Sequence, residues 1–268
     1  MKVRRVTTRN ARFQQWQALQ VNRAKRQRLG EFLVQGVRPI TLAVRCGWTV
    51  RALLHDGERP PSRWAEELLR THQDETFAMA PDLLAELGEK EDPAELVAVV
   101  AMPPDDLTRI PVGPDFLGVA FDRPVSPGNV GTLIRSADAF GAHGVVVTGH
   151  AADVYDPKAV RASTGSLFAL PVVRAAGHRE VADWLAAAER PVTVIGTDED
   201  GERELADLDL SGPVLFAVGN ETGGLSAGWR ELCHHVAHIP MTGTASSLNA
   251  ASAATIALYE TTRQRRHA

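Results

Sequence analysis

Short apolar runs alternate with helical stretches through the second half of the chain, and this alternation restricts the fold more than any other feature. The run at 116–122, F-L-G-V-A-F-D, is apolar throughout, which is typical of a strand covered on both faces. Helices are expected over Thr132–Phe140 and near 179–189. Further strands are expected at 144–149, 171–174, 192–197, 214–219 and 235–240. Strands separated by helices predict an α/β fold with a parallel sheet and right-handed crossovers.

The last strand runs into the stretch Ile239–Glu260, which is typical of a strand end, a tight loop and a helix. Ser246 or Ser247 can cap this helix. The loop offers unpaired backbone groups to a small ligand, and Gly243 allows close approach of the backbone. The loop is therefore a candidate binding site, although most strand–loop–helix units of this kind bind nothing. One apolar helix face is indicated by spacings of three and four between Leu248, Ala251, Ala254 and Leu258.

Two earlier stretches accompany it: Phe121–Gly141, F-D-R-P-V-S-P-G-N-V-G-T-L-I-R-S-A-D-A-F-G, and Leu215–Ser226, L-F-A-V-G-N-E-T-G-G-L-S. In this order the three resemble the motifs of the SpoU, or TrmH-like, RNA ribose 2′-O-methyltransferases of the SPOUT superfamily. The resemblance covers about the last 150 residues, the usual size of one domain. It implies a SPOUT domain at 115–268 that ends in a trefoil knot, which general folding rules would not predict.

The first half of the chain predicts a separate small α/β domain at 1–105, followed by a linker rich in proline at 101–114. A helix is expected from Asn10 to Leu29, with Phe13, Trp16, Leu19 and Val21 toward the core. Strands are expected at 31–36, 49–56, 76–79 and 96–102, with helices between them. The segment 31–40, E-F-L-V-Q-G-V-R-P-I, resembles the small domain that precedes the catalytic domain in several family members. That domain is similar to a ribosomal RNA-binding protein, which implies that 1–105 holds RNA.

Charge is distributed unevenly along the chain. Residues 1–30 carry nine Lys or Arg and no acid, whereas the rest of the chain has a net charge of −13 and the whole chain −4. A run of charges is usually a solvated helix face, but nine like charges without a counter-charge favour contact with RNA. The predicted RNA-binding residues are Arg23, Lys25, Arg26, Arg28, Arg38 and Arg161.

Asn129 and Arg135 lie six residues apart across a loop and the start of a helix, so both can meet one RNA phosphate. The alternatives are a helix cap for Asn129 and a surface ion pair for Arg135. By resemblance, Arg135 matches the family's catalytic arginine and Asn129 its motif-one asparagine. Because a guanidinium keeps its proton, we expect Arg135 to fix a phosphate and stabilise the forming alkoxide.

Glu221 follows a buried strand within a glycine-rich turn, where its carboxylate can reach backbone N–H groups or Arg135. The alternative is a carboxylate that only organises the turn. Ser247 and Asn249 supply a hydroxyl and an amide near the start of the last helix. Either could be only a cap, yet both match the family's S-L-N, so they join the predicted catalytic residues.

The resemblance implies S-adenosylmethionine as cofactor. Gly219, Ile239 and Leu248 match the family's cofactor-contacting positions, and Thr197 and Met241 are further candidates. No dinucleotide or P-loop glycine motif is present. The run 198–200, D-E-D, is expected to be a solvated turn. The run 233–238, C-H-H-V-A-H, invites a zinc site but lies in an expected strand without a second cluster, so no metal is predicted.

The resulting hypothesis is a two-domain methyltransferase that acts on a ribose 2′-hydroxyl, which must be aligned and deprotonated. Ribosomal RNA is favoured over transfer RNA by the N-terminal domain. The alternatives are the same reaction on transfer RNA, a non-catalytic RNA-binding protein, and a base-modifying SPOUT enzyme.

The partners and location follow from composition and from the family. Two cysteines far apart, a polar N-terminus and no apolar run of about 20 residues predict a cytoplasmic protein without a membrane span. The resemblance implies a homodimer through the knotted domain, and the alanine-rich helix near the C-terminus allows close packing.

Overall fold

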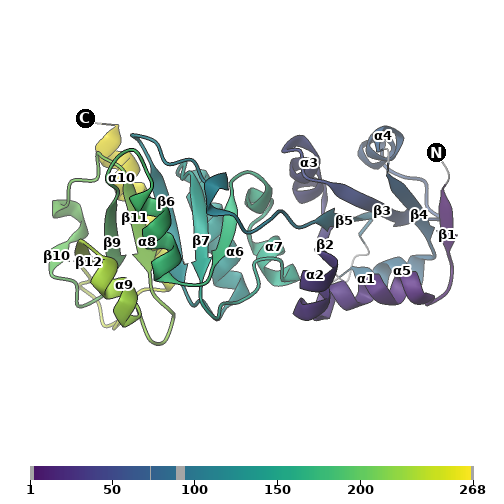
Figure 1. Cartoon of the computed structure of the whole chain (residues 1–268). Coiled ribbons are helices and arrows are strands. Elements are labelled where there is room, and N and C mark those ends of the chain that lie inside the picture. Colours follow the sequence, from purple (N-terminus) through teal and green to yellow (C-terminus); the bar gives the residue numbers. More distant parts are fainter. Residues whose placement is uncertain (1–2, 73, 89–93, 267–268) are drawn as a thin grey trace. The chain divides into compact units, whose positions relative to one another are not determined.

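The computed structural model describes residues 3–72, 74–88 and 94–266, which form two compact units (Figure 1). The first unit holds Met1–Pro103 together with Tyr155–Ala169, and the second holds Pro104–Val154 together with Leu170–Ala268. The assignment of 155–169 to the first unit is unexpected, because the sequence analysis places this segment with 115–268.

The first unit is built around a five-stranded sheet. Its strands are β1 (Arg4–Val6), β2 (Glu31–Gln35), β3 (Val50–Asp56), β4 (Glu75–Met79) and β5 (Leu96–Ala101), in the order β1-β4-β3-β5-β2. β1, β4 and β3 are parallel, whereas β5 is antiparallel to β3 and β2. The last four strands match the prediction. β1 was not anticipated, because three residues are too few to show a period.

The predicted single helix from Asn10 to Leu29 is instead two helices, α1 (Ala11–Val21) and α2 (Arg23–Leu29). Asn22 separates them with an extended backbone, φ −121° and ψ 101°. Its side chain accepts a hydrogen bond from the Lys25 N–H at 3.0 Å and so caps α2. Asparagine is more stable at a helix cap than inside a helix, so α1 ends at Asn22 although the helical pattern of the sequence continues to Leu29.

The core of the first unit contains Phe13, Trp16 and Leu19, as predicted, whereas Val21 is 84% exposed and was placed wrongly. The Trp16 and Phe77 rings meet edge to face, 4.8 Å between centroids. The remaining elements of this unit are α3 (Val37–Arg45), α4 (Arg63–Thr71), α5 (Pro81–Leu87), α7 (Pro157–Ala162) and the 3-10 turn Ser166–Phe168.

Aromatic contacts hold 155–169 within the first unit. The Phe32 ring lies 4.7 Å from that of Tyr155, and the Trp48 ring lies 5.0 Å from that of Phe168. Trp48 also donates from Nε1 to the Phe168 carbonyl at 3.2 Å. Burial of large aromatic side chains explains why this segment joins β2 and α3.

The second unit contains a seven-stranded sheet with the order β10-β12-β9-β11-β6-β7-β8, and every pairing in it is parallel. This confirms the predicted parallel α/β sheet. The bounds are β6 (Leu117–Asp122), β7 (Gly144–Thr148), β8 (Val172–Ala175), β9 (Thr193–Thr197), β10 (Arg203–Glu204), β11 (Val214–Val218) and β12 (His235–His238). β6, β7 and β11 are buried along their whole length, as their apolar runs indicated.

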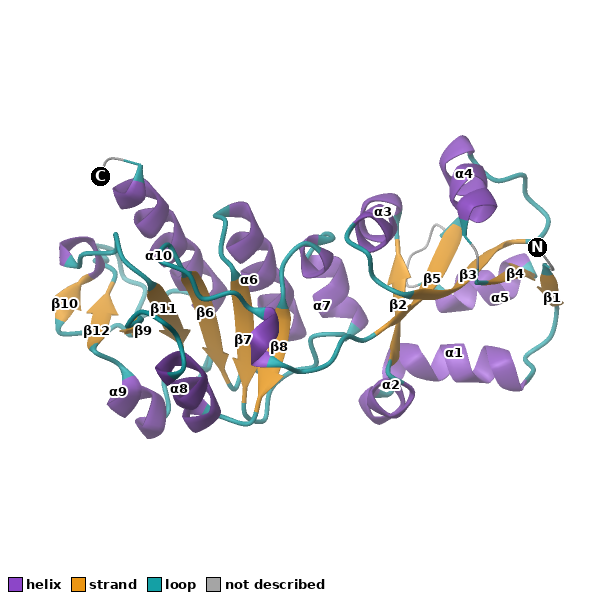
Figure 2. Cartoon of the chain, turned by 45° about the horizontal axis from the view of Figure 1, so that its top comes forward, coloured by secondary structure: helices purple, strands orange, loops and turns teal. Residues whose placement is uncertain are grey.

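Helices cover both faces of this sheet: α6 (Pro127–Ala139) and α10 (Ala250–Arg265) lie on one face, α8 (His178–Ala186) and α9 (Ala227–Leu232) on the other (Figure 2). Short 3-10 turns occur at Leu107–Arg109 and Leu205–Asp207. Ser136 of α6 and Thr255 of α10 are hydrogen-bonded through their hydroxyl groups at 2.7 Å. The knot implied by the resemblance stays a prediction.

Both helices that flank the motifs begin elsewhere than predicted. α6 begins at Pro127, not Thr132, because the Ser126 hydroxyl caps it and proline suits the first helical position. α10 is capped by Asn249, not by Ser246 or Ser247, and Leu248 therefore precedes the helix and is 38% exposed. Across 3–72, 74–88 and 94–266, no helix combines the length and apolar character needed to cross a bilayer.

Candidate active site

The three sequence motifs meet at the carboxyl edge of the parallel sheet, around the Glu221 carboxylate. Glu221 accepts hydrogen bonds from the backbone N–H groups of Val125 at 2.9 Å and Ser126 at 3.2 Å, and from Nδ2 of Asn129 at 2.9 Å. Burial raises the pKa of this carboxyl, but these hydrogen bonds outweigh burial, so the Glu221 pKa lies below its usual value. The carboxylate is therefore held in its charged form.

Asn129 extends the network from the second motif to the third. Its Oδ1 accepts from Nδ2 of Asn249 at 3.1 Å, while Oδ1 of Asn249 accepts from the N–H groups of Ala251 and Ser252. Glu221, Asn129 and Asn249 thus form one chain of hydrogen bonds. Because both ends of its amide are hydrogen-bonded to Glu221 and Asn249, Asn129 neither caps α6 nor is oriented toward an RNA phosphate in this conformation.

Arg135 lies on the exposed surface of α6, outside this chain. Among the hydrogen bonds that join described residues, none connects Arg135 to Glu221. Of the two kinds of partner expected for this carboxylate, backbone N–H groups or Arg135, the structure shows the backbone N–H groups. Arg135 lies in the second half of α6 and is exposed to solvent. This position leaves it accessible to a large anionic substrate.

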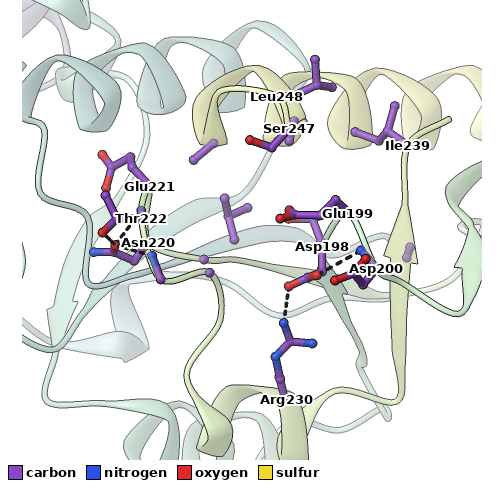
Figure 3. A pocket seen from close by; sticks show the side chains of 18 of the residues that line it. Asp198, Glu199, Asp200, Asn220, Glu221, Thr222, Arg230, Ile239, Ser247 and Leu248 are labelled. Carbon is purple, nitrogen blue, oxygen red and sulfur yellow. Dashed lines mark hydrogen bonds and ion pairs between the residues drawn. The ribbon is translucent and has the colours of Figure 1, made fainter. Parts of the chain in front are cut away.

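A cavity of about 400 Å³ opens beside the network (Figure 3). All five predicted cofactor positions line it, together with Glu221 and Ser247: Thr197, Gly219, Ile239, Met241 and Leu248. Gly219 lies against the backbone of the turn that follows it, where an added Cβ would meet the Gly224 carbonyl carbon at 2.3 Å and the Leu225 nitrogen at 2.4 Å. Only glycine fits there.

One wall of the cavity is acidic. This was not foreseen, because 198–200 was expected to be a solvated turn. Asp198, Glu199 and Asp200 follow β9 directly and line the cavity opposite Asn220 and Glu221 (Figure 3). Asp198 forms an ion pair with Arg230 and is only 6% exposed. The position of 198–200 in the sequence could have indicated this role, because a loop that follows a parallel strand lies at the ligand-binding edge of the sheet.

A second network is centred on Asp122 and Arg123, which were not among the predicted site residues. Buried Asp122 accepts from the Ser226 N–H at 3.0 Å and from Nε of Arg123 at 3.1 Å. Arg123 donates to the Gly224 carbonyl at 3.2 Å, and its own carbonyl accepts from Nδ2 of Asn220 at 2.6 Å. The backbone of Arg123 has φ 52°, in a region that residues other than glycine rarely adopt. These bonds hold the Glu221 turn in place.

The predicted RNA-binding residues divide into two groups. Arg26 is only 2% exposed and donates from Nη1 to the carbonyls of Leu19 at 2.7 Å and Gln20 at 3.1 Å. It also lies 3.7 Å from the Asp156 carboxylate. The expectation that Arg26 contacts RNA is therefore corrected, since its guanidinium is used inside the first unit. The exposed or half-exposed members are Arg23, Lys25, Arg28, Arg38 and Arg161.

Two of the three histidines of 233–238, His234 and His238, have structural contacts. His234 Nδ1 accepts from the Val194 N–H at 3.0 Å, and His238 Nδ1 lies 2.9 Å from the Gly201 carbonyl. Burial raises the pKa of the Cys233 thiol to about 11, which keeps it protonated. Within the described part of the chain, no group of three or more His, Cys, Asp or Glu is placed to hold a metal ion.

Comparison with known proteins places these features in a family. The sequence model of the SpoU L30e-like domain matches residues 10–98, and that of the SpoU rRNA Methylase family matches 117–259. The 23S rRNA (uridine(2479)-2′-O)-methyltransferase of Streptomyces viridochromogenes is 65% identical over 266 residues, which cover 98% of this chain and 93% of that protein.

Crystal structures that resemble nearly the whole chain include the following two. The SpoU methyltransferase AviRb from Streptomyces viridochromogenes, in complex with the cofactor AdoMet, has a TM-score of 0.93 at 64% identity, covering 96% of this chain and 99% of that one. An AdoMet-bound rRNA methyltransferase from Sinorhizobium meliloti has a TM-score of 0.88 at 29% identity, covering 99% and 98%. The chain therefore belongs to the SpoU rRNA methylase family.

Proposed function

We propose that this protein transfers a methyl group from S-adenosylmethionine to a ribose 2′-hydroxyl of ribosomal RNA. The observation that carries the proposal is the convergence of the three SpoU motifs, through Glu221, Asn129 and Asn249, beside a cavity lined by every predicted cofactor position. The whole-length similarity to a 23S rRNA 2′-O-methyltransferase supports the reaction and the class of RNA. The expected division of labour is RNA binding by 1–105 and catalysis by 115–268.

The cavity suits S-adenosylmethionine in size and in charge. Its volume of about 400 Å³ is within the range of small-molecule sites. S-adenosylmethionine supplies an activated methyl group on a cationic sulfonium. The acidic wall at Asp198, Glu199 and Asp200 favours a cation, and the Gly219 turn brings backbone groups to the cavity surface.

The side chains around the cavity divide into positioning and substrate-contacting roles. Glu221 and Asn129 hold the start of α6 against the second motif, and Asn249 fixes the start of α10, so these three set the shape of the site. Ser247 lines the cavity and offers a hydroxyl to the ribose. Exposed Arg135 binds the phosphate next to the target nucleotide and stabilises negative charge on the 2′-oxygen.

The proposed reaction is tested by incubating the protein with unmodified 23S rRNA transcribed in vitro and S-adenosylmethionine, then analysing the nucleosides by mass spectrometry. We expect a 2′-O-methyl nucleoside that is absent when the cofactor is omitted. A methylated base, or no methylated nucleoside, would contradict the proposal. Transfer RNA assayed in parallel tests the alternative substrate, since stronger methylation of transfer RNA would overturn the assignment to ribosomal RNA.

The proposed assembly is a homodimer through the second unit, and the proposed location is the cytoplasm, where ribosomal RNA is modified and the free thiols of Cys46 and Cys233 stay reduced. Two apolar side chains of α10 are exposed in the single chain, Ile256 at 38% and Tyr259 at 54%. Small residues that are exposed or half-exposed on the same helix, Ser252 and Ala253, permit close approach of a second surface. Light scattering at micromolar concentration should give twice the chain mass of 29.0 kDa, and a monomer would contradict the dimer.

A further inference from the structure

A second cavity, of about 540 Å³, lies within the first unit and uses none of the SpoU motifs. Its lining residues come from the end of β2, the start of α3, Trp64 of α4, the start of β5, and α7. Most of its surface is apolar. The principal apolar lining residues are Leu33, Val37, Pro39, Trp64, Leu96 and Val160.

The aromatic residue in this lining has its polar atom already satisfied. Nε1 of Trp64 donates to the Thr41 hydroxyl at 3.0 Å, and Thr41 lies outside the lining. The indole therefore contributes apolar ring surface to the cavity without an unpaired donor. A flat ligand with a π face would gain stacking and dispersion energy against such a surface.

Charged groups complete the lining, and two of the three are cationic. Arg38 is exposed and donates from Nε to the Thr164 carbonyl at 3.2 Å, which orients the guanidinium and leaves it further donors. Arg161 lies on α7 and is also exposed. Glu95 is held by the backbone N–H and the hydroxyl of Ser62, the hydroxyl at 2.9 Å. The cavity therefore combines apolar walls, fixed acceptor oxygens and arginines open to solvent.

We propose that this cavity takes one unstacked base of the RNA substrate, with Arg38 and Arg161 on the adjoining phosphates. The inference rests on the proposed function, because it assigns part of the same RNA to the first unit. Bases that leave the helical stack are bound by aromatic and apolar surfaces and read through hydrogen bonds at their edges. Each of the four bases carries an N–H donor at its edge, and the Glu95 carboxylate is an acceptor.

The charges distinguish this occupant from an apolar peptide or a small apolar ligand. An apolar peptide side chain would fill the apolar walls but would bring no anion to the exposed guanidinium of Arg38. A nucleotide fits both the apolar walls and the arginines. The faces of its base are flat and largely apolar, and its phosphates carry the negative charge that a guanidinium binds through its planar fork. The first unit also carries the exposed or half-exposed basic residues Arg23, Lys25 and Arg28.

The experiment fills the cavity without changing charge. Val37 is 56% exposed and lines the cavity, so Val37→Trp should fold normally and occupy the space of the base. Val21→Trp is the matched control, since Val21 is 84% exposed in the same unit and outside the lining. We expect Val37→Trp to weaken binding of unmodified 23S rRNA in filter-binding assays by about tenfold, as loss of one stacked base implies. Val21→Trp should bind as the parent does.

A second pair tests the charge. Arg38→Gln should weaken the same binding and reduce its salt dependence, whereas Arg45→Gln, on the same helix but outside the lining, should have little effect. Calorimetric binding of S-adenosylmethionine should be unchanged in all four variants. Circular dichroism melts of each variant show whether it is folded.

A third measurement uses the unmodified protein, so that it does not depend on a folded variant. 23S rRNA containing photoreactive 4-thiouridine or 6-thioguanosine is crosslinked to the parent protein, and the attached peptide is identified by mass spectrometry. Crosslinks to the segment 33–39 or to Trp64 would support the inference. Parental affinity in Val37→Trp, or crosslinks confined to other segments, would overturn it. Methyl transfer by the parent protein reports separately on the proposed function, so the two failures can be distinguished.

Discussion

Replacing Glu221 with glutamine tests whether its carboxylate joins the motifs. Oε1 of Glu221 accepts from the Ser126 N–H and from Nδ2 of Asn129, and Oε2 accepts from the Val125 N–H. The amide of glutamine can keep its oxygen at the Oε1 position and retain two of these bonds. Its NH₂ group then faces the Val125 N–H, donor against donor, and one charge-assisted bond is lost.

The expected loss of stability follows from this geometry. A hydrogen bond to a charged group contributes about 1.5–3 kcal/mol. Because Val125 is 60% exposed and water can replace the lost acceptor, the low end, about 1.5–2 kcal/mol, applies here. For a unit of this size, that corresponds to a decrease in Tm of about 3–8 °C at neutral pH.

The difference should also depend on pH. The Glu221 pKa is lowered in the folded protein from its usual 4.5, so the stability that the charged carboxylate contributes is fully present above that value. It is lost as pH falls through the lower folded pKa. Thermal melts of Glu221→Gln and the parent should therefore differ most at neutral pH and converge in acid. Glu199→Gln is the control, since Glu199 lies exposed on the same cavity. Equal Tm values at pH 7, or a gap that persists unchanged into acid, would refute the reasoning.

Three further outcomes are expected from the proposed roles. Arg135→Ala should abolish methyl transfer while calorimetric cofactor binding stays near normal, and retention of more than about a tenth of the activity, a barrier change below roughly 1.4 kcal/mol, would remove Arg135 from the reaction. Glu199→Gln should weaken S-adenosylmethionine binding twofold to fivefold, as an exposed pair worth about 0.4–1 kcal/mol implies, and an unchanged Kd by calorimetry would argue against the acidic wall. Replacing Arg23, Lys25 and Arg28 together with glutamine should weaken binding of 23S rRNA and make its salt slope shallower by about 0.7 per lost contact on single strands. If the salt slope in filter binding equals that of the parent protein, these residues form a solvated face and do not contact RNA.

Local sequence predicted those features that local physics controls. A strand covered on both faces must be apolar along its length, and the runs that became β6, β7 and β11 can be identified for that reason. The motif residues Glu221, Asn129 and Asn249 could be singled out from the resemblance. The hydrogen bonds that join these three side chains to one another were not foreseen. For Glu221, backbone N–H groups and Arg135 were both considered as partners. The helix starts were wrong because several polar residues in each loop could serve as the cap.

By itself, the sequence determined the alternating α/β plan, the parallel sheet of the second unit and the set of residues from which the site is built, since each depends on periodicity or on the identity of short motifs. Tertiary structure alone decided which polar groups are buried and paired. Arg26 belongs to a basic run, yet Leu19, Gln20 and Asp156 take its guanidinium out of solvent. The run 198–200 is a polar turn in sequence and a cavity wall in space. The physical reason is that burial and hydrogen-bond partners come from residues far apart in the chain, where no local pattern records them.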